Sequence, residues 1–498
     1  MLEGLQALGL LAVFVISTLL MFYRLLPAIL ALPLMAILIA LIGGVSPTHV
    51  LEYVIGQGPL KLSSAYTIAM FGGMLSLILQ KTGVAESFIK KGAELSGDNP
   101  WLISVTMLSL IALLFTTLGG LGAIIMVATI VLPVLAAVGV GPLTTVGIFL
   151  FGVSIGGTLN VGNWALYQSV MALSIDQIRP FALLIFGLLF GLALVYITLQ
   201  LYFDGHDINL RAIALRGLLA LGLIAGSVMG WFYAVPATLR QQLATGWSQA
   251  WWGIQMAIGA ALALLLISVL MRAWRHRQAE SVPIHWSAYL APVLPLVLIL
   301  VYSLNFITAF VFGVLYAFAA TYRKGRLNTL IQASIEGAGV VMPAVLLMFG
   351  IGMILVAIMG PGGDAIKEAY PEGWPVLNVI QPFTRQLIPT QPLAYVITFS
   401  LAAPLALYRG PLNLWGMGFG LATAFMAAGL PPAAVMGLLM SVGQIQGISD
   451  PTNTQNVWLA SEVRVDVQKV TWNTLPYAWS VAILGLIASA WWFMGSPA

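Results

Sequence analysis

Long apolar runs separated by short polar segments dominate this chain. A helix needs about 20 consecutive apolar residues to cross the hydrocarbon core of a bilayer. Runs that approach this length lie at about residues 5–23, 25–44, 63–80, 179–203, 212–233, 251–271, 288–303, 305–322, 340–359 and 475–494. The pattern therefore predicts an all-α polytopic membrane protein, with about 12 crossings once interrupted runs are included.

Two pairs of shorter apolar runs have a Gly-rich or turn-forming tip between them. The first pair, at about 101–138, is interrupted by Thr116 to Gly122, and the second, at about 392–428, by Tyr408 to Pro411. Each pair is followed by an apolar run with a polar break in its middle, at about 142–175 and 431–465. Backbone polar groups at membrane depth must be buried in protein or line a wet cavity. We therefore predict two re-entrant hairpins and two broken transmembrane helices.

The two halves of the chain repeat the same order of features. Gly139 to Pro142 aligns with Gly429 to Pro432, and the same offset pairs Gly147 with Gly437 and Asn163 with Asn453. We predict a first repeat at residues 1–203 and a second at 278–498. Residues 204–277 would form a linker with two extra spans.

The placement of basic residues predicts that the repeats face in opposite directions. Short cytoplasmic loops carry an excess of Lys and Arg. Ser46 to Gly58, after the second span, contains neither, whereas Arg323 to Arg326 occupies the equivalent place in the second half. After the third span the bias is reversed, with Lys81, Lys90 and Lys91 in the first half. Inverted repeats with broken helices are typical of secondary transporters.

Composition supports a membrane protein and excludes several other classes. The chain has 498 residues, of which 60% are hydrophobic and 7% charged, and its mean hydropathy is +1.00. Soluble domains carry about 25% charged residues. The net charge of +4 is spread over short loops, so we expect no nucleic-acid partner, and the absence of cysteine excludes disulfides and thiol chemistry.

No credible catalytic set is present, so we do not expect an enzyme. The sequence contains no H-E-x-x-H motif, phosphate loop or metal-ligand spacing. Gly152-Val153-Ser154-Ile155-Gly156 matches the G-x-S-x-G elbow, but that motif requires a strand, a turn and a helix. In an apolar helix it is better interpreted as a G-x-x-x-G packing face.

The tips and breaks contain the residues that could bind a substrate and a coupling ion. Half-helix N-termini attract carboxylates, and carbonyls freed by unwinding, with Asn, Thr and Ser oxygens, suit a hard cation such as sodium. The predicted substrate-binding residues are Thr116, Thr117, Gly119, Gly120, Asn160, Asn163, Arg409, Gly410, Asn413, Thr452 and Asn453. The predicted coupling-ion residues, where Na⁺ would bind, are Thr158, Asn163, Ser449, Asp450, Asn453, Thr454 and Asn456.

The sequence allows more than one role for Arg409 and for Asp450. An intramembrane charge indicates function by default, and Arg suits bidentate carboxylate binding. Arg409 could instead extend to the membrane face or pair with Asp450. Asp450 could ligate a cation, carry a proton or neutralise Arg409. Gln444 and Gln446 lie two residues apart, so a regular helix is expected to point them in different directions.

This order of hairpins and breaks resembles the ion transporter superfamily, which includes gluconate-, citrate- and C4-dicarboxylate-type permeases and sodium/proton antiporters. In its divalent-anion/sodium symporters, Ser-Asn-Thr motifs at the hairpin tips hold sodium and carboxylate. Here the most similar string, Thr452-Asn453-Thr454, lies in a helix break. The resemblance implies elevator-type movement of the hairpin-bearing part, within a homodimer.

The sequence thus predicts an ion-coupled secondary active transporter of a small organic anion, a mono- or dicarboxylate, in a bacterial cytoplasmic membrane. Its partners would be the anion, the bilayer and a second copy of the chain. No cofactor is expected other than Na⁺ or H⁺ as the coupling ion. The alternative is a sodium/proton antiporter of the same superfamily, in which Asp450 exchanges ions.

Overall fold

The computed structural model describes residues 2–23, 25–211, 235–275, 283–362, 364–414 and 418–495, with isolated positions between 212 and 234. The predicted span at 212–233 therefore lies largely outside the described residues. Throughout these ranges the regular secondary structure is helical, as predicted.

The helices of the first half follow the predicted order. They are α1 (Leu2–Phe22), α2 (Ala28–Ile42), α3 (Pro47–His49), η1 (Val50–Gln57), η2 (Gly58–Leu62), α4 (Ser63–Lys81), α5 (Val84–Ser96), α6 (Pro100–Phe115), α7 (Leu121–Ala137), α8 (Pro142–Thr158), α9 (Val161–Met171) and α10 (Ile175–Phe203). The predicted first hairpin is α6 and α7. The predicted first break separates α8 from α9, which are bent by 49° relative to each other.

The second half contains the corresponding elements. They are α12 (Ala237–Arg275), η4 (Trp286–Leu290), α13 (Leu294–Tyr302), α14 (Phe306–Thr321), α15 (Arg326–Val340), α16 (Met342–Met359), α17 (Asp364–Ala369), α18 (Pro375–Leu387), α19 (Pro392–Ala402), η5 (Ala403–Arg409), α20 (Phe419–Ala427), α21 (Pro432–Ser449), α22 (Thr454–Glu462) and α23 (Val467–Phe493). The second hairpin is α19, η5 and α20, and the second break separates α21 from α22.

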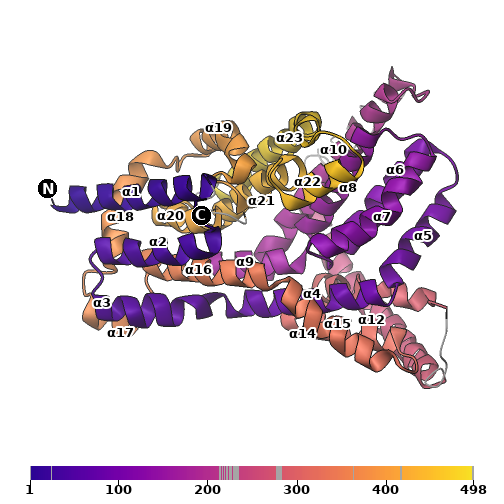
Figure 1. The fold of residues 1–498 in the computed structure, drawn as a ribbon, viewed down its shortest axis with the longest axis horizontal. Coiled ribbons are helices and arrows are strands. Elements are labelled where there is room, and N and C mark those ends of the chain that lie inside the picture. Colours follow the sequence, from indigo (N-terminus) through magenta and orange to yellow (C-terminus); the bar gives the residue numbers. More distant parts are fainter. Residues whose placement is uncertain are drawn as a thin grey trace.

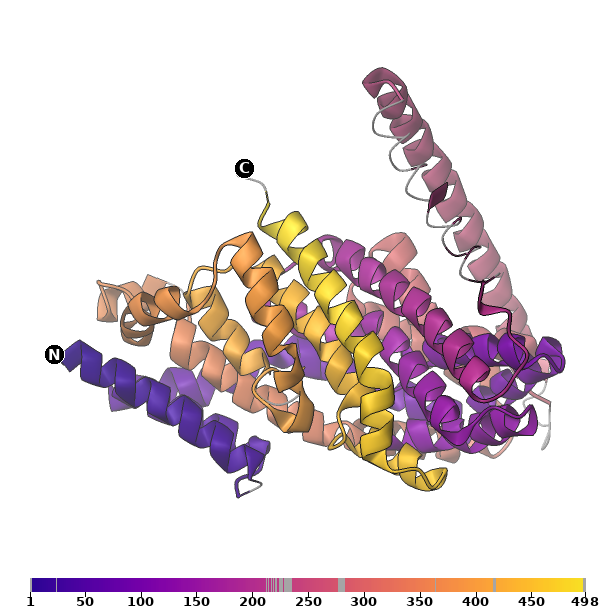
Figure 2. The same cartoon turned by 90° about the horizontal axis from the view of Figure 1, so that it is seen from above.

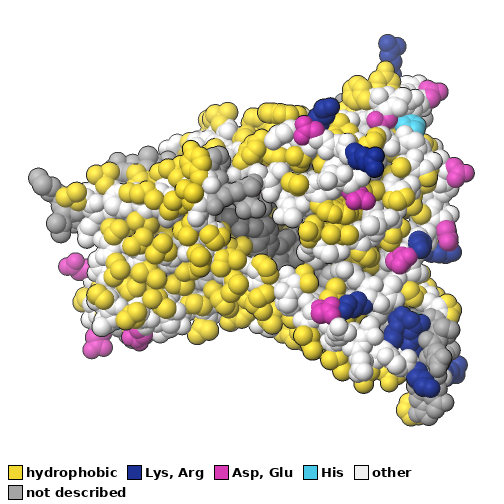
Figure 3. All heavy atoms as spheres, viewed as in Figure 1, with side chains coloured by type: hydrophobic (Ala, Val, Ile, Leu, Met, Phe, Trp, Pro, Cys, Tyr) yellow, Lys and Arg dark blue, Asp and Glu magenta, His cyan; other side chains and the backbone are white. Residues whose placement is uncertain are grey.

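The described helices confirm an all-α polytopic membrane protein. By length and apolar composition, six of them could each cross a membrane, or seven segments if the bent pair counts as one span. Five shorter apolar helices, including α2, α6 and α7, supplement these. Figure 1 shows α8, α9, α21 and α22 in the middle of the molecule, and Figure 2 shows α12 standing away from the bundle. Hydrophobic side chains cover most of one half of the face in Figure 3.

One stretch differs from its prediction. Residues 360–391 belong to no predicted apolar run and are expected from the sequence to form a polar loop. In the structure they contain α17 and α18. Val376 and Ile380 of α18 are buried, at 0% and 6% exposed. The helix forms because its apolar residues fall on one face, and its internal Pro382 obscures this period in the sequence. Like α5 in the first half, α18 precedes a hairpin.

Close glycine contacts join the two halves in an antiparallel arrangement. A Cβ atom on Gly73 of α4 would overlap the carbonyl oxygen of Gly337 of α15, and the converse also holds. Further along the two segments, a Cβ atom on Gly352 would overlap the Gly58 carbonyl oxygen, and one on Gly58 would lie 2.8 Å from the Met353 Cα atom. The order of contacts is reversed between the two segments, so they run in opposite directions. Such a contact needs glycine because only its backbone can approach this closely.

The broken helices pack equivalently in the two halves. Gly147 of α8 lies against the Tyr196 side chain of α10, and Gly437 of α21 lies against Ser489 of α23. These two glycines are the pair that the sequence offset aligned. The inverted repeat is therefore visible as matching contacts as well as matching order.

We predict that Gly73→Leu lowers the free energy of unfolding by about 1–3 kcal/mol or more, because the added side chain overpacks a backbone contact. Thermal unfolding of the purified protein in detergent measures this. Gly191→Leu is the control, since no heavy atom lies within 4 Å of a Cβ at that position. Equal midpoints for the two variants would contradict the close contact.

Candidate functional site

The two helix breaks meet at one cavity inside the bundle. The cavity has a volume of about 350 Å³. Its lining comes from both repeats: Val153, Ser154, Gly157, Thr158, Asn163, Tyr167, Leu414, Leu439, Met440, Gly443, Gln444, Gln446, Gly447, Asn453 and Gln455. No Asp, Glu, Lys, Arg or His belongs to this set, so the described lining is polar without formal charge. Residues of both predicted broken helices therefore line the same cavity.

In the first break, side chains replace the hydrogen bonds that the interrupted helix lacks. Asn160 precedes α9, and its Oδ1 accepts from the Gly162 amide at 3.0 Å. Asn163 donates to the Gly157 carbonyl at 2.9 Å, and the Trp164 indole donates to the Thr158 carbonyl at 2.8 Å. The last carbonyls of α8 are therefore satisfied by residues of the helix that follows.

The second break uses the same chemistry. Gln455 donates to the Gly447 carbonyl at 3.1 Å, and Asn456 donates to the Ile448 carbonyl at 3.1 Å. Asn453 lies 3.4 Å from the Gln446 carbonyl. Asn456 is the third residue of α22, as Asn163 is of α9.

The structure thus corrects the predicted pairing of Asn163 with Asn453. Asn160 corresponds to Asn453, because each immediately precedes its half-helix. Asn163 then corresponds to Asn456, three residues further along in each case. The fixed offset fails here because the second break, from Asp450 to Asn453, is longer than the first, at Leu159 and Asn160.

Each hairpin is hydrogen-bonded to the broken helix of its own repeat. In the first half, Asn160 donates to the Phe115 carbonyl at 3.1 Å. In the second half, the Gln446 side-chain oxygen accepts from the Leu414 amide at 2.7 Å. Asp450 adds further contacts to the second hairpin.

Asp450 is 1% exposed and serves as a hydrogen-bond acceptor for the second tip. Its Oδ1 accepts from the Tyr408 amide at 3.0 Å and from the Thr452 amide and hydroxyl at 2.9 and 2.8 Å. Its Oδ2 lies 3.4 Å from the Asn413 side-chain nitrogen. A buried carboxylate is costly unless it is hydrogen-bonded in this manner. The carboxylate does not line the shared cavity.

A second cavity, of about 280 Å³, adjoins the first. The first hairpin tip lines it with Thr117, Gly119 and Gly120, and α4, α14 and α16 close its other side. Both cavities are lined by Val153, Gly157, Asn163 and Gln455. Gly120 has a φ of +83° and gives α7 no side-chain cap. Amide groups at the start of α7 are therefore left near this cavity without a cap.

The side-chain amides have a definite orientation at these breaks. Asn163, Gln444, Asn453 and Gln455 each place their amide nitrogen against a main-chain carbonyl, which can only accept. Among the described residues, none donates to the four amide oxygens. Asn456 Oδ1 is likewise buried without a partner in the described chain. Gln446 has the opposite orientation, since its oxygen accepts from Leu414. The breaks therefore offer more acceptors than donors.

Some of the predicted site residues line these cavities and others do not. Those that line them are Thr117, Gly119, Gly120, Thr158, Asn160, Asn163 and Asn453. Those outside both cavities are Thr116, Gly410, Asn413, Ser449, Asp450, Thr452, Thr454 and Asn456. The Arg409 side chain lies outside what the structure describes. The functional roles assigned to all these residues stay predictions.

Several cavity residues were missed as site residues. Ser154, Tyr167, Gln444, Gln446 and Gln455 all line the first cavity. Gln444 and Gln446 both line it, although a regular helix points them apart. The Gln444 side chain donates to the Met440 carbonyl of its own helix at 2.9 Å. The signal in the sequence that could have identified such residues is a polar side chain within an otherwise apolar helical run.

The packing interpretation of the G-x-x-x-G motif is supported. A Cβ on Gly152 would lie 2.8 Å from Ile111, and one on Gly156 would overlap the Ala112 carbonyl oxygen. Both contacts are with α6. Ser154, between the two glycines, faces Gly447 of the second repeat instead.

Comparisons with known proteins identify the fold. No protein family model matches the sequence, and no curated protein sequence matches it. The structure is similar to that of the Alcanivorax borkumensis YdaH transporter, described as having an unusual topology. The two share 14% identity and a TM-score of 0.52 over 90% of this chain and 88% of that one.

A second similar structure is that of Neisseria gonorrhoeae MtrF, described within a class of antimetabolite efflux pumps. It has 14% identity and a TM-score of 0.46, over 90% of this chain and 83% of that one. The YdaH structure is not described as that of a gluconate, citrate or C4-dicarboxylate permease, so that narrower resemblance gains no support from it. The chain therefore shares the fold of a polytopic helical membrane protein with the YdaH transporter.

Proposed function

We propose that this protein is an ion-coupled secondary active transporter of a small organic anion. The observation that carries the proposal is the shared cavity in which two polar helix breaks, one from each repeat, meet inside the bundle. Broken helices placed in this way expose backbone ends to a substrate or an ion. A protein that served only as a scaffold would have no use for two such breaks.

The carboxylate of the substrate would bind toward the first hairpin tip. The start of α7 has no side-chain cap, and neither has the start of α22, because Asn453 makes no capping hydrogen bond. Uncapped N-termini provide N–H donors and a partial positive charge. Gly119 and Gly120 let the ligand approach the backbone closely. No fixed charge in the described lining competes with these donors.

The coupling ion would bind to the amide oxygens between the breaks. Asn163, Gln444, Asn453 and Gln455 leave these oxygens unpaired within the described chain, and Asn456 Oδ1 is buried without a partner. Oxygen acceptors of this kind suit Na⁺ better than an anion. A cavity of about 350 Å³ is larger than one ion needs, so water or substrate would share it.

Elevator-type movement would carry the hairpins and breaks past α4, α14 and α16. The second cavity supports this division because it lies between the first tip and those three helices. Glycine contacts hold α4 against α15 and η2 against α16, which suits a rigid scaffold. A second copy of the chain would steady that scaffold in a homodimer, in the cytoplasmic membrane of a bacterium.

A sodium/proton antiporter is less well supported by the geometry. An exchanging carboxylate must reach water, whereas Asp450 is buried and its oxygens accept from Tyr408, Thr452 and Asn413. We therefore propose that Asp450 holds the second tip to its break and that the transported ion binds elsewhere.

We predict that Gln455→Leu reduces uptake in proteoliposomes by about tenfold or more. A bound polar group that loses its buried hydrogen-bond partner loses about 1.4 kcal/mol or more of binding free energy. Gln455 lines both cavities. Gln242→Leu on α12 is the matched control, since that glutamine is exposed. Full uptake by Gln455→Leu would remove this residue from the site.

A thermal-shift screen against mono- and dicarboxylates, with and without sodium, tests the substrate class. A ligand that binds only the folded protein raises its unfolding midpoint. We expect a carboxylate to raise the midpoint more when sodium is present. Sodium-driven proton flux through the wild-type protein without any organic acid would instead favour the antiporter.

Asp450 variants separate the two roles of that residue. We predict that Asp450→Ala lowers the unfolding free energy by about 1–3 kcal/mol for each buried donor left unpaired. Asp450→Asn keeps one acceptor oxygen, so it should recover part of both stability and uptake. Asp98→Asn, at an exposed site, is the control. An Asp450→Asn protein with wild-type stability and no coupled transport would show that the carboxylate itself carries the ion.

A further inference from the structure

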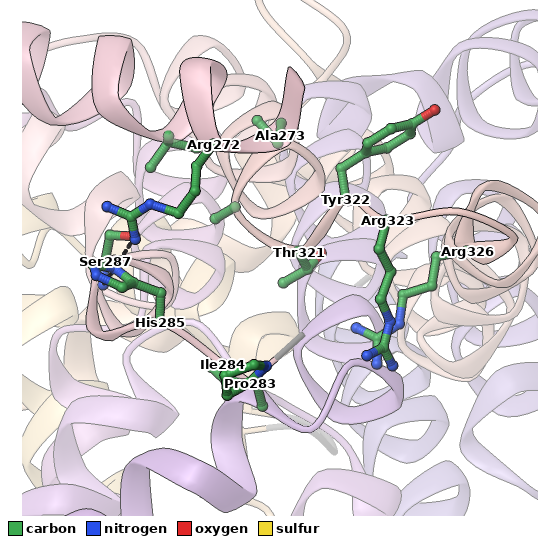
Figure 4. A pocket seen from close by; sticks show the side chains of 13 residues that line it. Arg272, Ala273, Pro283, Ile284, His285, Ser287, Thr321, Tyr322, Arg323 and Arg326 are labelled. Carbon is green, nitrogen blue, oxygen red and sulfur yellow. Dashed lines mark hydrogen bonds between the residues drawn. The ribbon is translucent and has the colours of Figure 1, made fainter. Parts of the chain in front are cut away.

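A basic pocket lies far along the chain from the helix breaks, where α12, η4, α14 and α15 come together. Its lining includes Arg272, His285, Ser287, Arg323 and Arg326. In Figure 4, Arg272 extends from α12 toward His285 and Ser287, while Arg323 and Arg326 lie on the other side. The pocket has about 50 Å³ of open space. This is several times what one water molecule requires.

The positive charge of this pocket is not neutralised within the described chain. No Asp or Glu lines it, and none of the ion pairs among the described residues involves its arginines. One nitrogen of Arg272, Nη1, is buried and has no hydrogen-bond partner there. A buried charged donor without a partner is costly, so this nitrogen indicates a missing anionic acceptor.

Arg323 and Arg326 both lie where a positive charge is destabilised by its surroundings. Arg323 and Arg326 repel each other electrostatically. Arg326 is the first residue of α15, whose first turn contains no acidic residue and whose N-cap, Gly325, supplies no side-chain cap. The N-terminus of a helix carries a partial positive charge. One weak contact, 3.5 Å from Arg326 to the Thr82 carbonyl, offsets this only in part.

His285 adds a neutral donor to the same pocket. The Ser287 amide donates to its Nδ1 at 3.2 Å, so the proton of the neutral ring is on Nε2. Burial lowers the pKa of His285, and the charge of Arg272 lowers it further. The ring therefore stays neutral near pH 7 and can donate to an anion through Nε2.

The surroundings of the pocket are those of a membrane surface. Leu270 and Trp274 of α12 are 52% and 69% exposed, and Leu327 of α15 is 48% exposed. Trp286, next to His285, is 62% exposed. Exposed Trp residues mark the level of the lipid headgroups. An acyl chain could thus lie along α12 or α15 while its headgroup occupies the pocket.

We propose that this pocket binds the phosphate of an anionic phospholipid headgroup, with Arg272, Arg323 and Arg326 as the anion ligands. Arginine forks match phosphate oxygens in pairs. Basic pockets between transmembrane helices on the cytoplasmic side are suited to such headgroups. The predicted cytoplasmic location of Arg323 to Arg326 agrees with this. The site is separate from the cavities of the helix breaks and does not depend on what the protein transports.

Thermal unfolding of the full-length protein in detergent, with added lipid, tests the proposal. Phosphatidylglycerol should raise the unfolding midpoint, whereas phosphatidylcholine, which has no net charge, should not. Inorganic phosphate alone should have little effect because it lacks the acyl chains. An equal rise with phosphatidylcholine would overturn the headgroup assignment, and a full rise with inorganic phosphate would show a free-anion site instead.

Arginine variants provide the residue-level test. Arg272→Gln with Arg323→Gln should weaken the apparent affinity for phosphatidylglycerol by about tenfold or more, the loss expected for charge-assisted hydrogen bonds. Without lipid, the same variant should unfold no earlier than the wild type, because a repulsion has been removed. Arg275→Gln, three residues further along α12 and outside the pocket, should bind lipid normally.

Two results would contradict the assignment of these residues. The first is wild-type lipid affinity in the double glutamine variant. The second concerns Arg272→Lys with Arg323→Lys, a folded alternative if the glutamine variant cannot be purified. The lysines keep the charge but lose the fork, so affinity should fall and the preference for phosphatidylglycerol should persist. Loss of that preference while both lysines are present would show that charge at these positions does not select the headgroup.

Discussion

The structure depends on how the backbone groups at the two helix breaks find hydrogen-bond partners away from bulk water. An interrupted helix leaves carbonyls at one end and amides at the other, and an apolar medium cannot satisfy either. Asn163 and Asn456 solve half of this problem in the same way, by donating back to carbonyls of the preceding half-helix. The breaks are therefore held in shape by their own side chains, which is what allows them to line a cavity.

This solution also sets the chemistry of the cavity. Once the amide nitrogens are committed to carbonyls, the amide oxygens are what the protein can offer to a ligand. The N–H groups at the uncapped start of α7 supply the opposite polarity a short distance away, beside a second cavity that shares residues with the first. One arrangement thus contains both of the places that we propose for a cation and for a carboxylate. Asp450, by contrast, is committed to holding the second tip.

Much of the fold could be predicted because membrane helices reveal themselves by length and apolarity. The hairpins, both breaks and the Gly147–Gly437 correspondence follow from runs and their order. The prediction was wrong for α18, which is an amphipathic helix with one internal proline and was expected to be a loop. Such a helix is recognised by the period of its apolar residues and not by the mean polarity of the segment. The prediction also failed where lengths differ, since the longer second break shifts the alignment from Asn453 to Asn456.

The sequence by itself determined that this is a polytopic helical membrane protein with two inverted halves, because hydrophobic length and charge placement are local properties of the chain. Only the tertiary structure decided which polar side chains face the shared cavity. That choice depends on where Gln444, Gln446 and Gln455 find partners across elements distant in sequence. It likewise decided that Arg272 lines the same pocket as Arg323 and Arg326. These like charges, 51 and 54 residues apart in the sequence, are brought together by packing, which no local pattern encodes.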